Sequence, residues 1–596
     1  MKTKLLLLIL LFCASIQSNA QNFLPTMKSR PADYEYLSAP DSLGVRHQLL
    51  MPSNTNKNVL AAQNLPYPII FIHGLNSSSD TWIDMGTNLV NKGLSFGGRI
   101  DFCLNDDGNN YTSNKLVYPT TNADIALYTN YTTELTVADF YLLNFNIDNF
   151  GRLPNNSNFN DVLSNESAIA KQGVALKIAI QMVLLKTGRD KVVLMGHSMG
   201  GLAAREYIQN PSNWQADGTH HVAKLITTGT PHGGYTGTNA EVATGIDGQS
   251  EAYRDLRKSY SWTGYDGVYL YGGTENSSII KNIWAFPFYN VDINCNGIDE
   301  DNTYITGLNY KTWRSSLDYS YIVGVCTNCS LLQGTIEGDG IVRSENANLS
   351  SFTNQTPLPA PKNEFIYTAA QTGNIGLHSE LPQAIPVNMQ GLDEPNEYSL
   401  SYGIEFNKTY KGFITQQPIG GYPVDFDEYK FIMPFNGTFS ISATNSFSNN
   451  LPFQILDASF NVVYTNTILP FSTTSFSLTL TAGQYYLEFF ATPTSTSYQY
   501  PYNFILSSAL STNTFVTNNS LNLFPNPTNS KVFFDNTNSN FNEVSIYNYL
   551  GQEVAKNSFM SIINNQEVDM SNLATGVYVL KFSTGDTSKS VKVIKQ

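Results

Sequence analysis

The first part of the chain alternates short apolar runs with longer amphipathic stretches. The runs YPIIFIHG, DFYLLNFN, KVVLM, VAKLITTGTP and DYSYIVGVC are each typical of a buried strand. Among them, the stretch NESAIAKQGVALKIAIQMVLLKTGRD places apolar residues at helical spacing and predicts a long helix that ends at Gly188. Strands separated by helices indicate a mostly parallel sheet covered by helices, and we assign this α/β domain to residues 21–390.

The pattern changes near residue 396. Runs such as GTFSISAT, SFSLTLTAGQYYLEFFA and YNFILSS alternate polar and apolar residues and show almost no helical period, which predicts a β-sandwich over residues 396–508. A polar linker, residues 509–519, leads to a second all-β block at residues 520–596. The expected architecture is therefore an α/β domain followed by two all-β sandwich domains.

The N-terminus has the form of an export signal. A basic start, MKTK, precedes the apolar run LLLLILLF and the small-residue site SNA, which predicts a signal peptide over residues 1–20. No later segment reaches the roughly 18 to 20 apolar residues that a membrane span requires. We therefore expect an exported chain with no transmembrane segment after signal removal.

Composition narrows the function classes. The net charge is -14 and only 14% of residues are charged, so no basic surface for nucleic acid is expected. No cofactor motif is recognisable either, and no cofactor is expected to be required. An exported chain of this kind favours a self-contained hydrolase.

Two serines lie in a G-x-S-x-G pattern, Ser95 and Ser198. A nucleophilic serine of this type stands on a sharp turn from a strand into a helix. Ser198 follows the run KVVLM and precedes the helical GGLAAREYI, whereas a helical pattern precedes Ser95 and an extended run follows it. The context predicts that Ser198 is the nucleophile and that Ser95 is a loop residue.

A nucleophilic serine needs a base and an orienting acid. Among the seven histidines, His378 in GNIGLHSELP comes late enough in the chain to follow the last strand, and we predict it to be the base. The acid is expected after the preceding strand, where Gly338-Asp339-Gly340 offers Asp339. Glu337 is the rival acid, although it could instead be a solvated loop charge, and Asp339 is preferred.

The oxyanion hole is expected to combine two backbone N–H groups, one after the nucleophile and one from the loop after the early strand. These are Met199 and, in FIHGLNSSSDTW, Leu75. Gly74 would give this loop its backbone freedom, and His73 would order it by hydrogen bonds.

These motifs together resemble the α/β-hydrolase superfamily. They are His73-Gly74-Leu75, GHSMGG at 196–201, TGTPHGG at 228–234, GDG at 338–340 and His378. Within the superfamily they most resemble bacterial triacylglycerol lipases and GPI inositol-deacylase-like esterases. The resemblance implies catalytic roles for Ser198, Asp339 and His378, in that chain order.

Residues 235–317 form a long insertion relative to this family. Its aromatic stretches, YSWTGYDGVYLYGG and NIWAFPFYNVD, could form a lid or an acyl-chain groove, or equally an aromatic layer packed on the sheet. Within it, Asp292, Asn294, Asn296 and Asp301 partly match a calcium loop, although Thr303 stands where a glutamate is usual. The alternatives are a structural Ca²⁺ site and an unliganded acidic turn.

The cysteines favour a structural role. In an exported chain Cys326-x-x-Cys329 indicates a disulfide more than a zinc or redox site, and with Cys103 and Cys295 three pairings are open.

The two C-terminal blocks carry further resemblances. Residues 396–508, with GFITQQPIGGYPVDFDEYKF and LTAGQYYLEFF, are similar to pre-peptidase C-terminal domains of secreted bacterial hydrolases, which implies either substrate or surface binding or a role as a spacer or stabilising module. Residues 520–596, with LNLFPNPTNSKVFF and GVYVLKF, resemble the C-terminal sorting domain of the Bacteroidota type IX secretion system. That resemblance implies passage across both membranes by the type IX machinery, followed by secretion or attachment to the cell surface.

The sequence thus predicts a secreted serine carboxylester hydrolase of the lipase or esterase type, acting on an ester or lipid substrate. A phospholipase or GPI-deacylase-like esterase and an amidase or peptidase are alternatives that use the same triad. A degenerate hydrolase fold that serves as a surface-binding protein is the non-enzymatic alternative.

Overall fold

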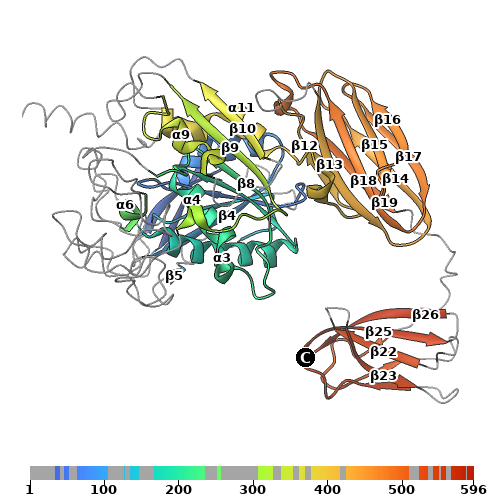
Figure 1. Ribbon diagram of the computed structural model, residues 1–596. Coiled ribbons are helices and arrows are strands. Elements are labelled where there is room, and N and C mark those ends of the chain that lie inside the picture. Colours follow the sequence, from blue (N-terminus) through green and yellow to red (C-terminus); the bar gives the residue numbers. More distant parts are fainter. Residues whose placement is uncertain are drawn as a thin grey trace, which may run out of the picture. The chain divides into compact units, whose positions relative to one another are not determined.

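The computed structural model of the protein describes most of the predicted strands and helices (Figure 1). The described residues are 34–40, 46–52, 63–104, 126–127, 135–146, 167–234, 251–256, 307–326, 337–352, 362–368, 377–416, 424–508, 523–534, 541, 543–548, 552–558, 566–584 and 587–596. The chain divides into two compact units, residues 1–508 and 509–596.

The first unit is built around a sheet that has eight strands within the described residues, in the order β10-β9-β8-β7-β3-β6-β4-β5. Seven of them run parallel, and β5 pairs antiparallel with β4. The predicted parallel α/β layering is confirmed. The strands are β3 (Ile69–Ile72), β4 (Phe96–Cys103), β5 (Ala126–Leu127), β6 (Phe140–Asn144), β7 (Val192–His197), β8 (Val222–Thr228), β9 (Asp318–Val325) and β10 (Lys362–Thr368).

Helices cover both faces of this sheet. Along β3, Ile69 and Phe71 belong to one hydrophobic cluster and Ile70 and Ile72 to another, as the alternation of side chains along a strand requires. The first cluster takes in α2 (Ile83–Asn91) and α11 (Ile385–Leu392), and the second takes in α3 (Ile169–Thr187) and α4 (Met199–Gln209). Figure 1 shows α3 and α11 on opposite sides of the sheet. Helix α3 ends at Gly188, in the left-handed conformation, as predicted.

Shorter elements complete this region. They are the antiparallel pair β1 (Tyr34–Pro40) and β2 (Arg46–Pro52), the helices α6 (Glu251–Leu256), α9 (Ser344–Ala347) and α10 (Leu377–Glu380), and the 3₁₀ turns η1 (Ser79–Trp82), η5 (Pro211–Asn213), η6 (Leu308–Tyr310), η7 (Leu349–Phe352), η8 (Leu381–Gln383) and η9 (Tyr398–Leu400). Within the described part of the chain, no helix has the length and apolar character needed to cross a bilayer.

A β-sandwich follows in the same unit. One sheet has the order β11-β13-β18-β15-β16 and the other β12-β19-β14-β17. Every second side chain faces the opposite sheet, so that Phe431 meets Phe439 and Tyr429 meets Phe504 in the core between them. The elements are β11 (Tyr402–Gly403), β12 (Thr409–Gly412), β13 (Asp425–Met433), β14 (Gly437–Thr444), β15 (Leu451–Asp457), β16 (Val462–Ile468), β17 (Thr473–Leu480), β18 (Gly483–Ala491), the 3₁₀ turn η10 (Ser497–Gln499) and β19 (Tyr502–Ser508).

The sandwich packs against the end of the parallel sheet at which the strands β3 and β7 begin. Tyr67, just before β3, accepts a hydrogen bond from the N–H of Gly403 at 3.1 Å. Arg189, just before β7, forms an ion pair with Glu405 at 2.8 Å and donates to the hydroxyl of Tyr410 at 3.3 Å. One continuous hydrophobic cluster runs from the parallel sheet into the sandwich core. The opposite edge, where the strands end, is therefore not the edge that the sandwich covers.

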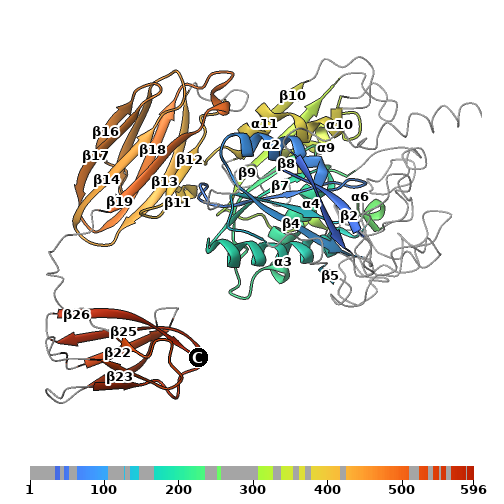
Figure 2. The same cartoon turned by 180° about the vertical axis from the view of Figure 1, so that it is seen from behind.

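The second unit is a small all-β sandwich of its own, shown from behind in Figure 2. Its described sheets have the orders β20-β21-β24 and β23-β22-β25-β26, and they share a core in which Phe534 contacts Phe582. Pro525 and Pro527 both follow cis peptide bonds. The strands are β20 (Leu523–Phe524), β21 (Lys531–Phe534), β22 (Glu543–Asn548), β23 (Glu553–Ser558), β24 (Gln566–Asp569), β25 (Gly576–Thr584) and β26 (Thr587–Lys595).

Candidate active site

Ser198 occupies the turn between a buried strand and a helix. It follows β7 directly and precedes the first residue of α4. Its backbone has φ 52° and ψ -129°, a conformation that a residue with a side chain rarely adopts. A strained backbone of this kind persists only where the surrounding structure imposes it. Here the sharp turn directs the hydroxyl of Ser198 outward at the carboxyl ends of the parallel strands.

A chain of hydrogen bonds runs from Ser198 to His378 and on to Asp339. The hydroxyl of Ser198 lies 3.0 Å from Nε2 of His378, and Nδ1 of His378 lies 2.6 Å from Oδ2 of Asp339. The other carboxylate oxygen of Asp339 accepts the backbone N–H groups of Ile341 and Val342, at 3.0 and 2.7 Å. The carboxylate is 1% exposed, so both of its oxygens are held in fixed directions.

The rival acid lies elsewhere. Glu337 is exposed, and its backbone carbonyl accepts from Ser344. The structure therefore brings Asp339, and not Glu337, against the ring of His378.

Gly229, in the TGTP segment after β8, allows these groups to meet. Its φ is +57°, and a Cβ atom there would lie 3.0 Å from Oδ2 of Asp339 and 3.2 Å from Nδ1 of His378. A side chain at this position would push the carboxylate and the imidazole apart.

The loop after β3 passes directly over the nucleophile. A Cβ atom on Gly74 would lie 2.6 Å from Cβ of Ser198, so only glycine permits this approach. Leu75 comes next in the loop, and Met199 begins α4, whose first N–H groups have no partner within the helix. Of the two predicted oxyanion donors, Met199 thus directly follows Ser198, and Leu75 follows the glycine that approaches it.

His73 orders this loop, as the sequence predicts. The N–H of Phe145 donates to Nε2 of His73 at 2.9 Å, so the ring proton is on Nδ1, which lies 2.9 Å from the carbonyl oxygen of Gly74. Burial lowers the pKa of His73 to about 4, and the ring is neutral. Because the C=O and N–H of a trans peptide point in opposite directions, holding the Gly74 carbonyl also fixes the direction of the Leu75 N–H.

Two parts of the chain match known protein families. Residues 67–322 match the family described as alpha/beta hydrolase fold. Residues 67–322 belong to an α/β-hydrolase domain. Residues 522–596 match the family described as secretion system C-terminal sorting domain, which indicates that this hydrolase is exported by the type IX route, to be secreted or attached to the cell surface.

Several solved structures are similar to the hydrolase chain at low identity. The gene lin2722 product from Listeria innocua is 15% identical, with a TM-score of 0.30, over 56% of this chain and 95% of the other. Lipase BlEst2 from Bacillus licheniformis, in its propeptide form, is 15% identical with a TM-score of 0.25, over 94% and 96% of the two chains. The pre-peptidase C-terminal domain of collagenase from Bacillus anthracis is 19% identical with a TM-score of 0.15, over 19% and 97%. None of the curated proteins matches the chain.

The sequence motifs gave His197, a member of GHSMGG, no role of its own in the candidate active site. Its Nε2 lies 2.9 Å from the backbone carbonyl oxygen of His378, and the two imidazole centroids are 4.8 Å apart. The signal that could have found it is Pro382, four residues after His378, since proline cannot donate the hydrogen bond that a helical carbonyl at position 378 would take.

Ser95, the other serine of a G-x-S-x-G pattern, has a structural role. It lies between α2 and β4, and its hydroxyl donates to Oδ2 of Asp139 at 2.9 Å. Asp139 also binds the N–H of Leu65 at 2.7 Å, near the start of β3. Ser95 is therefore a loop residue, as its context predicts.

The predicted calcium loop, with Asp292, Asn294, Asn296 and Asp301, lies outside the described residues, as do the signal peptide and most of the 235–317 insertion. The calcium site stays a prediction. Cys326 is disulfide-bonded. The side chains of the other cysteines lie outside the described residues, so the three pairings stay open.

The described residues hold a different group of buried carboxyl groups, at the junction with the sandwich. Oxygen atoms of Asp393, Asp425 and Asp427 all lie within 4.8 Å of one another, and they could serve as ligands to a divalent cation. Burial raises the pKa of Asp425 to about 7, and burial beside Asp393 raises that of Glu394 to about 8. Burial therefore favours the protonated form of these carboxyl groups.

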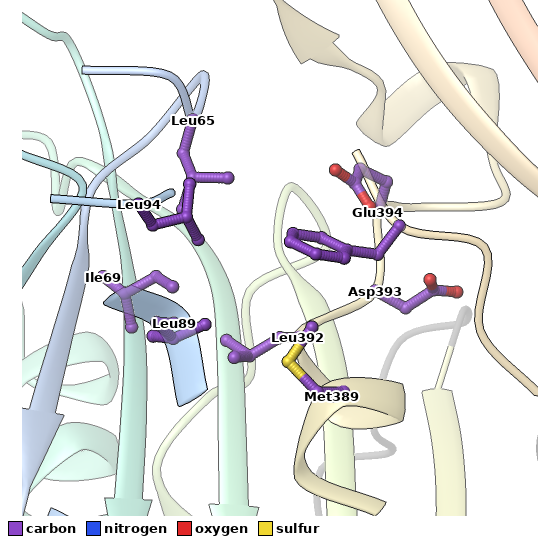
Figure 3. A pocket seen from close by; sticks show the side chains of 9 residues that line it. Leu65, Ile69, Leu89, Leu94, Met389, Leu392, Asp393 and Glu394 are labelled. Carbon is purple, nitrogen blue, oxygen red and sulfur yellow. The ribbon is translucent and has the colours of Figure 1, made fainter. Parts of the chain in front are cut away.

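A small apolar pocket lies beside this cluster (Figure 3). Leu65, Ile69, Leu89 and Leu94 line one side, and Met389 and Leu392 line the other, while the carboxylate of Asp393 points away from them. Ile69 is the first residue of β3, whereas Gly74 follows the end of that strand. The pocket is thus at the edge of the sheet opposite Ser198 and does not belong to the candidate active site.

Proposed function

We propose that the protein is an exported serine hydrolase that cleaves carboxylic esters, of the lipase or esterase type. The observation that carries the proposal is the hydrogen-bonded chain from Ser198 through His378 to Asp339, at the end of the parallel strands of an α/β-hydrolase domain. Fold alone would not support a reaction, because one fold hosts many functions.

The reaction follows from the directions of these hydrogen bonds. Nε2 of His378 takes the proton of Ser198 as the serine oxygen attacks the ester carbonyl, and the protonated ring then gives that proton to the departing alcohol. Water repeats the sequence on the acyl-serine and releases the acid. Asp339 holds Nδ1–H and keeps the lone pair of Nε2 toward the serine.

The negative charge on the tetrahedral intermediate needs fixed donors. We assign this role to the N–H groups of Leu75 and Met199. The fixed Gly74 carbonyl and the position of Met199 at the start of α4 support the assignment, because a helix N-terminus favours negative charge. Loss of one such donor typically lowers turnover about a hundred- to a thousandfold.

The match to a sorting domain supports a substrate outside the cell, because it indicates export of the chain. Acyl esters, including those of lipids, are therefore the proposed substrate class. Esters of the phospholipid or GPI type and amides are alternatives to be separated by assay.

The test is hydrolysis of a chain-length series of p-nitrophenyl esters by the mature protein, beside the Ser198→Ala variant. Turnover is expected in the wild type and is expected to fall at least about a thousandfold in the variant. Ser95→Ala is the matched control, since it removes the other serine of the same pattern and should retain wild-type turnover. No ester turnover, or equal turnover in the Ser198→Ala protein, would reject the proposal, and faster cleavage of a matched anilide than of the ester would favour an amidase.

A further inference from the structure

His197 is buried directly beside the proposed base. It is 5% exposed at the end of β7, with its ring tilted 42° to that of His378 and edge-on to the ring of Trp82. Its Nε2 lies 2.9 Å from the carbonyl oxygen of His378. A carbonyl oxygen only accepts, so Nε2 of His197 carries the proton and donates it.

The carbonyl of His378 needs this donor for a reason that is visible in the sequence. His378 lies in the short helix α10, and in an α-helix its carbonyl would accept from the N–H four residues later. That residue is Pro382, which has no N–H. The side chain of His197 takes the place of the missing backbone donor and joins the base to the strand that ends at the nucleophile.

The ring of His197 is held neutral. The pKa of His197 lies well below its ordinary value, mainly because the ring is buried and secondly because His378 is close. Its Nδ1 is buried without a hydrogen-bond partner among the described residues. A neutral ring can donate from Nε2, and it does not oppose the positive charge that His378 gains during the reaction.

We propose that His197 is a positioning residue for the base: it holds the main chain of His378 so that Nε2 of His378 stays within hydrogen-bond reach of Ser198. This inference rests on the proposed serine hydrolase function. Asp339 fixes the rotation of the His378 ring, and His197 fixes the backbone that carries the ring. Two attachments are needed, because a displacement of about 1 Å can cost a hundredfold in rate.

The experiment compares wild type with His197→Phe, which keeps a ring and removes the donor, and with His197→Gln, whose amide can donate in its place. Ester kcat and KM are measured, together with the rate at which an organophosphonate labels Ser198. Counting active sites by that label restricts the rates to folded enzyme. We expect His197→Phe to lower kcat and the labelling rate roughly ten- to a hundredfold with KM changed by less than about twofold, and His197→Gln to recover most of the loss.

A second route restores the same hydrogen bond. Pro382→Ala supplies an N–H at the position where the helix lacks one, and it is expected to recover part of the activity of His197→Phe while the single Pro382→Ala variant stays near wild type. A kcat for His197→Phe within about twofold of wild type would overturn the inference, and so would a loss that neither restoring change reduces. A wild type that neither hydrolyses esters nor reacts with the phosphonate would instead reject the proposed function, and this inference with it.

Discussion

Replacing Asp339 with asparagine is the sharpest perturbation that the site allows. One carboxylate oxygen accepts two backbone N–H groups, from Ile341 and Val342, and the other faces Nδ1 of His378. An asparagine must direct its single carbonyl oxygen toward those two donors. Its NH₂ group then faces Nδ1, which can no longer keep its proton.

The expected loss follows from that change of tautomer. With the proton moved to Nε2, His378 cannot accept from Ser198, and kcat is expected to fall about ten-thousandfold, which is about 5 kcal/mol of transition-state stabilisation. Folding should change little, because the two backbone donors remain satisfied; Asp339→Ala would leave both unpaired and cost about 1 to 3 kcal/mol each.

The assay is ester turnover per active site, with the melting temperature measured on the same samples. Glu337→Gln serves as the matched control, because Glu337 is exposed in the same turn. The reasoning is refuted if Asp339→Asn keeps more than about a tenth of wild-type turnover, or if Glu337→Gln shows the large loss instead.

Three further predictions concern stability and access. Raising the pH from about 5 to about 8 should lower the melting temperature. In the folded protein the pKa values of Asp425 and Glu394 are about 7 and about 8, above their ordinary values, so the folded form keeps protons that the unfolded form releases. The contribution of these two groups to the free energy of unfolding is therefore complete below about pH 4 and is lost as the pH rises through the folded-state pKa values. Calorimetry with Asp425→Asn should show a flatter dependence, and an unchanged slope contradicts this. Gly74→Ala should lower kcat at least about a hundredfold with little change in melting temperature, because its Cβ would meet Ser198 at 2.6 Å; wild-type turnover would argue against the close approach. Chelation should lower the melting temperature of the wild type and Ca²⁺ should restore it, and Asp292→Ala should abolish both effects if residues 292–301, rather than the Asp393, Asp425 and Asp427 cluster, bind the ion; no change in the wild type would argue against the site at 292–301.

The sequence predicts the layered fold and the triad geometry because both depend on local patterns taken in chain order. The strand before Ser198 and the helix after it are periodic signals, and they separate this serine from Ser95 without a structure. The choice of Asp339 over Glu337 depended on flanking glycines, and Gly340 does adopt a positive φ of 96° in that turn.

Two features were not predicted because neither belongs to a recognised motif, unlike the equally distant pair of Ser198 and His378. The bond between His197 and His378 spans 181 positions, and nothing near His197 announces which carbonyl it meets. The hydrophobic core that the hydrolase domain shares with the sandwich was also not predicted. The apolar pattern around Leu65 and Ile69 predicts that these residues are buried, but not which segment buries them. The treatment of residues 396–508 as a separate module therefore omitted the continuous cluster.

The docking of the sandwich on the starting edge of the parallel sheet has a consequence for the order of folding. Tyr67 meets Gly403 across 336 positions, and Arg189 meets Glu405 across 216. Such pairings close long loops and give the catalytic half a high contact order, which slows folding. Since residues 403–410 come after the whole parallel sheet in the chain, this end of the sheet can be covered only after they have been synthesised, and its native packing is completed late.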